Sequence, residues 1–374
     1  MGQNPIQRLN PETMSYKIRT TCLQFSFLLL SLLFWLSGFS QKKPVPPPSP
    51  YNFEAVDQLF KQNQKNLNND YVVLIWKDSG LVYQKQGSDD FTPKTPAPIA
   101  GAGNWLTAAL VMTFVDEGKI SLDDKVTKYI PLFGKYMKGY ITIRNCLTNT
   151  TGIQADGGGI SKVMAKSKYE SLEAEVESYA SKRDIVTNPG TEFLYSNVGP
   201  NIAARVLEIV TKKGFDRLMQ ERILRPLKMR STSFTNEDGG AINPAGGARS
   251  SALDYINFLS MLLNKGQFGD KRVLSEKAVK EMETAQFISL PVKFAPRNIQ
   301  GARYGLGNYI LASGAGDSPT VMACPNMLGS TPFIDRCRNY AAILLVLKPE
   351  EEQRRDLSVS MKNLIDELIP SGCK

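Results

Sequence analysis

The sequence predicts a mixed α+β fold, in which an antiparallel sheet takes strands from both ends of the chain and a mainly helical lobe lies beside it. Two observations lead to this prediction. Strand-like runs rich in apolar and β-branched residues occur at residues 71–83 and again between residues 304 and 347. Most of the chain between them carries apolar residues at helical spacing. Strands at the two ends of a chain are joined most economically in one antiparallel sheet.

The first elements lie in the N-terminal third of the chain. Residues 53–67 have helical periodicity. Tyr71–Trp76 and Leu81–Tyr83 flank the turn-forming sequence Asp78-Ser79-Gly80, a pattern typical of a β-hairpin. The run Trp105–Val115 is apolar nearly all round, which indicates a fully buried helix.

The remaining elements follow the same two patterns. Helical spacing predicts helices at residues 198–210, 215–224, 252–263, 275–282 and 352–368. Strand-like runs predict strands at residues 304–311, 328–334 and 340–347. The last two strands would be joined by a short turn at Asp335-Arg336.

The composition is that of a globular protein: 374 residues, of which 42% are hydrophobic, 22% charged and 9% aromatic. The formal net charge is +9, from 45 basic and 36 acidic residues. We identify no dense Lys/Arg tract and no basic stripe interleaved with aromatic residues. The excess positive charge is therefore interpreted as general surface charge, suited to an anionic cell envelope, and no nucleic-acid partner is expected.

The chain contains no histidine. This excludes Ser-His-Asp and Cys-His catalytic groups, histidine-ligated zinc and any imidazole general base. The cysteines show no Cys-x-x-Cys spacing either. We therefore expect no metal site and no cofactor.

The N-terminus carries the pattern of an export signal. Lys17 and Arg19 precede an apolar run, Phe25–Phe39, which ends in small residues. This arrangement is typical of a signal peptide that is cleaved before Gln41. The alternative is a transmembrane anchor, but fifteen residues fall short of the roughly 20 that span a bilayer.

These features divide the chain into a signal peptide at residues 1–40, a proline-rich linker at residues 41–50 and a single domain at residues 51–374. Either Met1 or Met14 could be the start, since the residues between them add nothing to the signal pattern. The expected location is periplasmic or extracellular. Contact with a membrane is expected only through the export signal.

Four cysteines remain after cleavage: Cys146, Cys324, Cys337 and Cys373. In an oxidising compartment they could pair in three ways, and the sequence does not choose among them. The oligomeric state is equally open.

Five segments carry motifs in a recognisable order along the chain. They are residues 98–126 (PIAGAGNWLTAALVMTFVDEGKISLDDKV), 141–153 (ITIRNCLTNTTGI), 189–197 (PGTEFLYSN), 246–263 and 324–347. Together they resemble the serine β-lactamase and penicillin-binding-protein family, in particular its class C β-lactamase-related members. The resemblance covers roughly residues 50–370. It implies the fold of that family and an ancestry among β-lactamases, D-alanyl-D-alanine carboxypeptidases and related esterases or peptidases.

The first segment corresponds to the family's Ser-x-x-Lys motif, but here the serine position is Gly101 and the lysine position is Asn104. Glycine has no side chain to acylate, and asparagine carries no charge that could activate a neighbour. Loss of the nucleophile in a serine hydrolase lowers turnover by about 10⁶. We therefore predict that the family's acyl-transfer chemistry is absent.

The second motif is retained. Tyr195 and Asn197 match the family's Tyr-x-Asn, in which the tyrosine moves protons and the asparagine binds substrate. The structural alternative is that Ser196 or Asn197 caps the helix that begins near Val198, with Tyr195 packed at its end.

The third motif is replaced. The family has Lys-Thr-Gly or His-x-Gly on the strand that lines its cleft, whereas this chain has Cys324-Pro325-Asn326. Cys324 is a candidate substitute nucleophile, with a buried or disulfide-bonded cysteine as the structural alternative. Asn149 stands where the family's Thr-His-Thr segment has its histidine.

Three hypotheses follow. In the first, the protein is inactive and binds a peptidoglycan-derived peptide, a β-lactam-like molecule or another carboxylate in the old cleft. The second is a divergent hydrolase that uses Tyr195 or Cys324. The third is a structural envelope protein without an open pocket. The ligand-binding residues expected under the first hypothesis are Gly101, Gly103, Tyr195, Asn197 and Met327.

Overall fold

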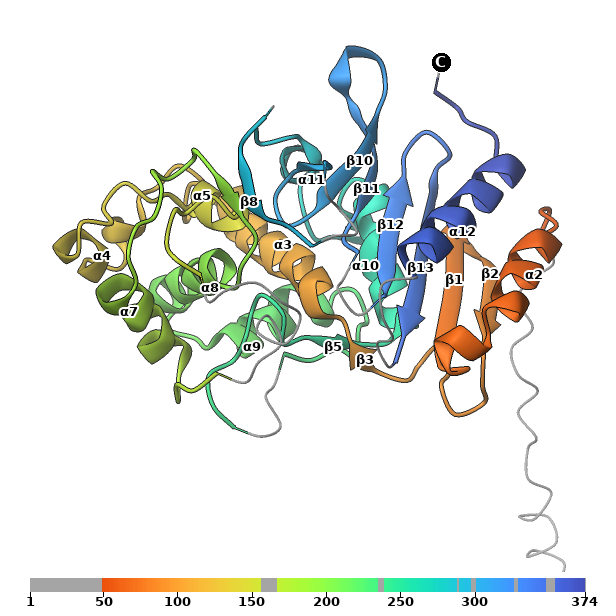
Figure 1. Cartoon of the computed structure of the whole chain (residues 1–374), viewed down its shortest axis with the longest axis horizontal. Coiled ribbons are helices and arrows are strands. Elements are labelled where there is room, and N and C mark those ends of the chain that lie inside the picture. Colours follow the sequence, from red (N-terminus) through yellow and green to blue (C-terminus); the bar gives the residue numbers. More distant parts are fainter. Residues whose placement is uncertain are drawn as a thin grey trace, which may run out of the picture. The chain divides into compact units, whose positions relative to one another are not determined.

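A computed structural model describes residues 49–155, 167–234, 239–287, 289–296, 301–325, 329–347 and 354–373. Its largest element is an antiparallel sheet of seven strands in the order β2-β1-β13-β12-β11-β10-β9 (Figure 1). The strands are β1 (Tyr71–Lys77), β2 (Gly80–Gln86), β9 (Arg303–Tyr304), β10 (Tyr309–Ser313), β11 (Pro319–Ala323), β12 (Thr331–Asp335) and β13 (Tyr340–Val346). Because β1 pairs directly with β13, the sheet does join both ends of the chain, and the predicted α+β class is confirmed.

Alternating side chains on the central strands supply two separate cores. On β1, Tyr71, Val73 and Ile75 face the helices α2 (Glu54–Gln62) and α12 (Arg354–Leu368). Val72 and Leu74 face the opposite side, which α10 (Ala252–Leu263) covers. Figure 1 shows this sandwich of helices on both faces of the sheet. Since both faces are covered, β13 is buried along its whole length and is apolar throughout.

The helical lobe surrounds α3 (Gly103–Asp116). Every residue of this helix from Gly103 to Phe114 is buried, as its nearly uniform apolar sequence predicts. The helices around it are α4 (Leu132–Lys135), α5 (Ile143–Leu147), α7 (Leu172–Lys182), α8 (Val198–Thr211), α9 (Phe215–Met219) with the π-helical turn η4 (Gln220–Leu224), and α11 (Glu276–Glu283).

Short strand pairs tie loops to this framework. They are β3 (Ala97–Pro98) with β5 (Arg249–Ser250), β4 (Phe193–Leu194) with β8 (Val292–Phe294), and β6 (Gln267–Phe268) with β7 (Lys271–Arg272). Of these, β3 leads directly into the start of α3, and β4 precedes Tyr195. Both therefore position residues of the candidate site.

The predicted strands of the large sheet recur with three differences. The strand expected at residues 304–311 is divided by a turn, in which the Gly305 N–H donates to the Asn308 carbonyl at 2.9 Å. The strand β11 was not expected, because its sequence lacks a clear apolar run. The expected turn between the last two strands is present but displaced: Asp335 is the last residue of β12, and the turn comprises residues 336–339.

A buried ion cluster explains why Asp335 lies within a strand. Its carboxylate is fully buried, accepts from Lys362 Nζ at 3.0 Å and from the Arg338 backbone N–H at 2.9 Å, and so binds α12 to the β12–β13 turn. A disulfide between Cys337 and Cys373 joins the same turn to the segment that follows α12. It leaves Cys146 and Cys324 as buried free thiols, which resolves the three pairings left open.

Within the described residues, no helix is both long enough and apolar enough to cross a bilayer. The expected signal peptide at residues 1–40, and all but the last two residues of the expected linker, lie outside the described residues. The division into signal, linker and domain stays a prediction.

Replacing Asp335 by Asn should lower the free energy of unfolding by about 3 kcal/mol, because it removes the buried negative charge opposite Lys362. Urea denaturation measures this change. Glu276→Gln is the matched control, since its ion pair with Lys265 is solvent-exposed and its loss should change stability far less. Equal losses in the two variants would contradict the structural role assigned to the cluster.

Candidate active site

A tight turn at the start of α3 presents Gly101. The preceding strand β3 is fixed by its pairing with β5, and the Ile99 N–H donates to the Ala248 carbonyl at 2.9 Å. Residues Ala100–Ala102 form a 3-10 turn that continues into α3, and Ala100 has a φ of 40°, which residues with a side chain adopt rarely. Gly101 is buried at this junction.

The backbone amides of this turn are already engaged. The Ala102 N–H donates to the Ile99 carbonyl at 2.9 Å, and the Gly103 N–H donates within the turn to the carbonyls of Ala100 and Gly101. A carboxylate at Gly101–Gly103 was expected to use such N–H groups. Two of the three are therefore not available to a ligand in this conformation.

Tyr195 reaches the same point from the helical lobe. Its own N–H donates to the Phe294 carbonyl at 3.0 Å, and the preceding strand β4 pairs in parallel with β8. The side chain is buried, and its hydroxyl accepts a hydrogen bond of 3.0 Å from Asn104 Nδ2. Gly101, Asn104 and Tyr195 were predicted as members of one motif set, and the structure brings the three together.

The Tyr195 hydroxyl lies in the space that a side chain at position 101 would need. A Cβ added to Gly101 would overlap this hydroxyl oxygen, so no residue larger than glycine fits while Tyr195 keeps its position. The substitutions at 101 and 104 are thus coupled through one phenol: glycine makes room for it and asparagine donates a hydrogen bond to it.

Cys324 follows β11 directly and borders the site on the side of the sheet. Its Sγ lies 3.2 Å from the Gly101 carbonyl oxygen and 3.5 Å from that of Gly307, as a weak S–H donor would. Burial raises the pKa of the Cys324 thiol, and burial likewise raises the pKa of Tyr195. Both groups therefore stay protonated at neutral pH. The other predicted residues of this motif, Asn326 and Met327, lie outside the described residues.

Tyrosines packed behind Tyr195 were not identified from the sequence. Tyr309 has its ring centroid 6.3 Å from that of Tyr195, and Tyr304 packs edge-on against Tyr309 at 4.6 Å. Tyr255 donates through its hydroxyl to the Ala102 carbonyl at 2.9 Å. No sequence signal distinguishes these three from ordinary core tyrosines, because they approach the site from distant segments.

Asn149 joins this cluster to the strand that carries Tyr195. Its Nδ2 donates to the Tyr304 hydroxyl at 3.1 Å, and its Oδ1 accepts from the Ser196 N–H at 3.2 Å. Its backbone carbonyl also accepts from the Leu194 N–H at 2.9 Å. The residue at the family's histidine position thus has a positioning role here.

Asn197 lies at the N-terminus of α8 and is half-buried. Its side chain makes no capping hydrogen bond, so of the two residues expected to cap this helix, Ser196 and Asn197, Asn197 does not. Ser196 takes a related role, since its Oγ accepts from the Val198 N–H at 3.4 Å.

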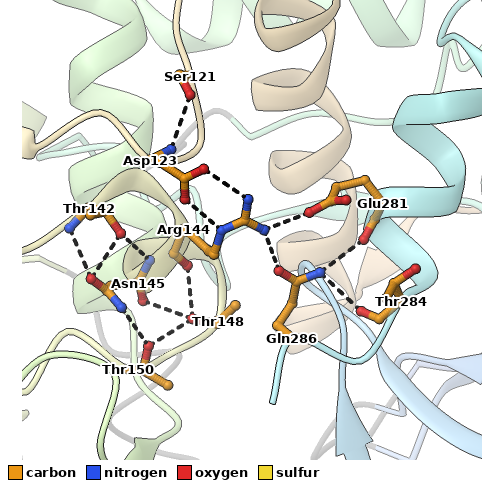
Figure 2. A network of polar contacts seen from close by, with 10 residues as sticks. All are labelled: Ser121, Asp123, Thr142, Arg144, Asn145, Thr148, Thr150, Glu281, Thr284 and Gln286. Atoms are coloured by element: carbon orange, nitrogen blue, oxygen red, sulfur yellow. Dashed lines mark hydrogen bonds and ion pairs between the residues drawn. The ribbon is translucent and has the colours of Figure 1, made fainter.

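Arg144 connects the helical lobe to the segment that leads into the site (Figure 2). It is the second residue of α5 and bonds Asp123 through Nε, while its Nη1 reaches both Glu281 and Gln286. Hydrogen bonding to Asp123 raises the pKa of this guanidinium. Because the Gln286 N–H donates to the Tyr304 carbonyl at 3.0 Å, the network holds the tyrosine cluster against α5.

Among the described residues, no group of three or more potential metal-ligating side chains lies together. The described side chains that meet at the site carry phenols, amides and one thiol.

Comparisons with known proteins identify a family and similar structures. The family model described as "Beta-lactamase" matches residues 56–358. Over an alignment 409 positions long, gaps included, the chain is 23% identical to a "Putative D-alanyl-D-alanine carboxypeptidase" of Salmonella paratyphi B, covering 87% of this chain and 92% of that protein. Over 146 residues it is 28% identical to "Protein flp" of Staphylococcus aureus, covering 38% of this chain and 29% of that protein.

A solved structure shows the same architecture. It is described as a "putative beta-lactamase from Bacteroides dorei" and superposes with a TM-score of 0.75 at 26% identity, covering 85% of this chain and 99% of that one. This superposition confirms the fold over most of the chain.

The contact between positions 101 and 195 can be measured by a double-mutant cycle. Gly101→Ala should lower the free energy of unfolding by about 1–3 kcal/mol through overpacking against the Tyr195 hydroxyl. Tyr195→Phe should cost about 1 kcal/mol, the worth of the Asn104 hydrogen bond. The phenylalanine removes the clashing oxygen. The double variant should therefore be about 1–2 kcal/mol more stable than the sum of the two single-variant losses predicts.

Gly80→Ala serves as the control for this cycle, since an added Cβ there meets nothing within 4 Å. It should change stability by less than about 0.5 kcal/mol. Strict additivity of Gly101→Ala and Tyr195→Phe would show that Tyr195 does not occupy the space beside Gly101.

Proposed function

The chain belongs to the beta-lactamase family, a family of serine-hydrolase fold, and on that premise we propose that it is an exported member that no longer hydrolyses substrates at the inherited site. One observation carries this proposal. The Tyr195 hydroxyl takes the space of the nucleophile's side chain and is hydrogen-bonded there by Asn104, which replaces the activating lysine. The site therefore lacks the nucleophile, and the Tyr195 hydroxyl occupies the space of its side chain.

The chemistry supports the same conclusion. Acyl transfer needs a nucleophile whose proton can be removed at low cost. Gly101 offers no such atom, and burial raises the pKa of both Tyr195 and Cys324 instead of lowering it. Among the described residues, the site holds no lysine or arginine hydrogen-bonded to either group. A divergent hydrolase based on Tyr195 or Cys324 is therefore disfavoured.

Of the two non-catalytic hypotheses, the closed pocket has the stronger support. Gly101, Asn104, Tyr195 and Cys324 are all buried. A carboxylate would also have to compete for amides that already donate within the Ala100–Ala102 turn. We accordingly propose a structural role in the cell envelope, with the tyrosine as a permanent part of the core.

Ligand binding is the second candidate, because two buried polar atoms of the described site lack a hydrogen-bond partner. Within the described residues, the Asn104 Oδ1 and the Tyr309 hydroxyl are buried without a hydrogen-bond partner. Buried polar atoms are ordinarily satisfied by protein or water. A peptidoglycan-derived peptide or a β-lactam-like molecule, as the names of the relatives suggest, would find hydrogen bonds here if Tyr195 moved.

Incubation with a fluorescent penicillin, followed by denaturing gel electrophoresis, tests the main proposal. The parent protein should show no covalent label, and hydrolysis of a chromogenic cephalosporin should be about 10⁶-fold below that of an active serine enzyme. Label on the parent, or turnover that disappears in Tyr195→Phe or Cys324→Ala, would refute it.

The variant Gly101→Ser/Asn104→Lys separates the two non-catalytic candidates in the same experiment. If Tyr195 is a fixed part of the core, the added serine is overpacked and stays unlabelled. Label gained by this variant would show that Tyr195 can withdraw and that a pocket opens behind it, which favours ligand binding over the closed-pocket role.

Export has its own test. Expression of the full chain in a bacterial host, followed by mass spectrometry of the protein's N-terminus, should yield a mature chain that begins at Gln41. A chain that keeps the apolar run Phe25–Phe39 would support the transmembrane-anchor alternative instead.

A further inference from the structure

The segment Lys125–Tyr140 combines positive charge with exposed apolar side chains. It contains four lysines, at 125, 128, 135 and 138, and no acidic residue. Seven large apolar side chains are classed as exposed among the described residues, and three of them lie here: Tyr136 at 39%, Met137 at 85% and Tyr140 at 75%. The other four are scattered over separate elements, so this is the one cluster of its kind in the described structure.

The local fold holds these side chains outward. Phe133 of α4 is fully buried, and the Lys138 N–H donates to its carbonyl at 2.8 Å while the Met137 N–H donates to that of Gly134 at 3.2 Å. These two bonds form a helix C-terminal motif whose central residue has a positive φ, here 60° at Met137. Glycine or asparagine is favoured at such a position. The presence of a methionine at 137 is therefore explained neither by its backbone conformation nor by burial of its side chain.

Lys138 attaches the segment to α7. Its side chain is buried and its Nζ donates to the Ala180 carbonyl, in the last turn of α7, at 2.7 Å. On the other side, the Val126 N–H donates to the Ile141 carbonyl at 2.9 Å. These hydrogen bonds fix the segment that carries the exposed residues. It lies beside α5 and α7 at the outer edge of the helical lobe (Figure 1).

Two of the lysines lie beside the exposed aromatic rings. Lys125 Nζ is 5.9 Å from the centroid of Tyr140, and Lys135 Nζ is 5.9 Å from that of Tyr136. Neither makes an ion pair with any described carboxylate, whereas Lys128 is paired with Asp124 at 2.9 Å. The surface thus presents two uncompensated positive charges around one methionine and two tyrosines. We call Lys125, Lys135, Tyr136, Met137 and Tyr140 the α4 surface.

We propose that the α4 surface docks the protein on an anionic lipid bilayer. Tyrosine is favoured at the membrane interface, where its ring is partly buried and its hydroxyl stays in water. An exposed, unbranched methionine can enter the acyl boundary, and lysines are attracted by anionic headgroups. A soluble polyanion would be bound by the lysines but would leave Met137 exposed.

The sequence alone indicates diffuse positive charge and membrane contact only through the export signal, and the folded structure differs in both respects. The lysines are spaced three to seven residues apart, so no dense tract is visible. Folding brings the residues of the α4 surface together and turns Phe133 and Lys138 inward. The proposal does not depend on whether the inherited site is catalytic.

Local fluorescence quenching tests the proposal on the full chain. Tyr140→Trp places a reporter on the α4 surface, and Val359→Trp on α12, also at an exposed apolar position, is the matched control. Vesicles contain brominated phosphatidylcholine, alone or mixed equally with phosphatidylglycerol. The reporter at 140 should be quenched by the anionic vesicles and the reporter at 359 should not, each measured relative to the parent protein.

Co-sedimentation of the protein with the same vesicles tests the lysines and the apolar side chains of the α4 surface separately. Lys125→Gln/Lys135→Gln should weaken binding to anionic vesicles about 25-fold, or about fivefold per lysine. Met137→Ser/Tyr140→Ser should weaken it as well, with circular dichroism to verify that the variants stay folded.

Three results would overturn the proposal. The first is a reporter at 140 that is unquenched, or quenched no more than the one at 359. The second is equal binding to uncharged and anionic vesicles. The third is binding to a soluble polyanion such as polyphosphate without binding to vesicles.

Discussion

The rest of the site depends on the contact between the Tyr195 hydroxyl and the bare Cα of Gly101. A glycine at this position would, by itself, leave a small void at the start of a buried helix. Here the void is filled by a phenol that Asn104 holds through a 3.0 Å hydrogen bond, with the Cys324 thiol lying against the Gly101 carbonyl. Packing therefore fills the space beside Gly101, as expected for a core that must stay close-packed.

The supporting residues follow from this contact. Tyr195 is held in place because β4 pairs with β8 and because Asn149 binds both its strand and Tyr304. Arg144 then fixes the backbone on which Tyr304 lies, through Gln286. Each of these residues acts through another on the position of one phenol. The chain has the fold of the beta-lactamase family. Under the proposed function, Gly101, Asn104 and Tyr195 contribute to the stability of that fold.

Much of the fold was predictable because its signals are local. The apolar run Trp105–Val115 predicted a buried helix, and α3 is buried from Gly103 to Phe114. The predicted hairpin and the final helix also recur. The strand β11 and the division between β9 and β10 were missed, because neither leaves a periodic pattern in so short a stretch.

The candidate site was predictable in its membership and not in its geometry. The motif positions 101, 104, 195 and 324 do meet, but nothing in the sequence shows that the Tyr195 hydroxyl would enter the space beside Gly101. That contact joins residues more than ninety positions apart and is set by tertiary packing. The same limit applies to the α4 surface, since the outward orientation of Met137 is decided by the burial of Phe133 and Lys138.

The most direct measurement of the central claim is a pH titration of the Tyr195 phenol, by ¹³C NMR of protein labelled at the tyrosine Cζ and assigned by comparison with Tyr195→Phe. Burial raises the pKa of this phenol above its ordinary value of 10.0. Its resonance should therefore stay constant, up through that pH, until the protein unfolds in alkali. A Tyr195 resonance that titrates near pH 10 in the folded protein would show that the phenol faces water and that the inherited site is open.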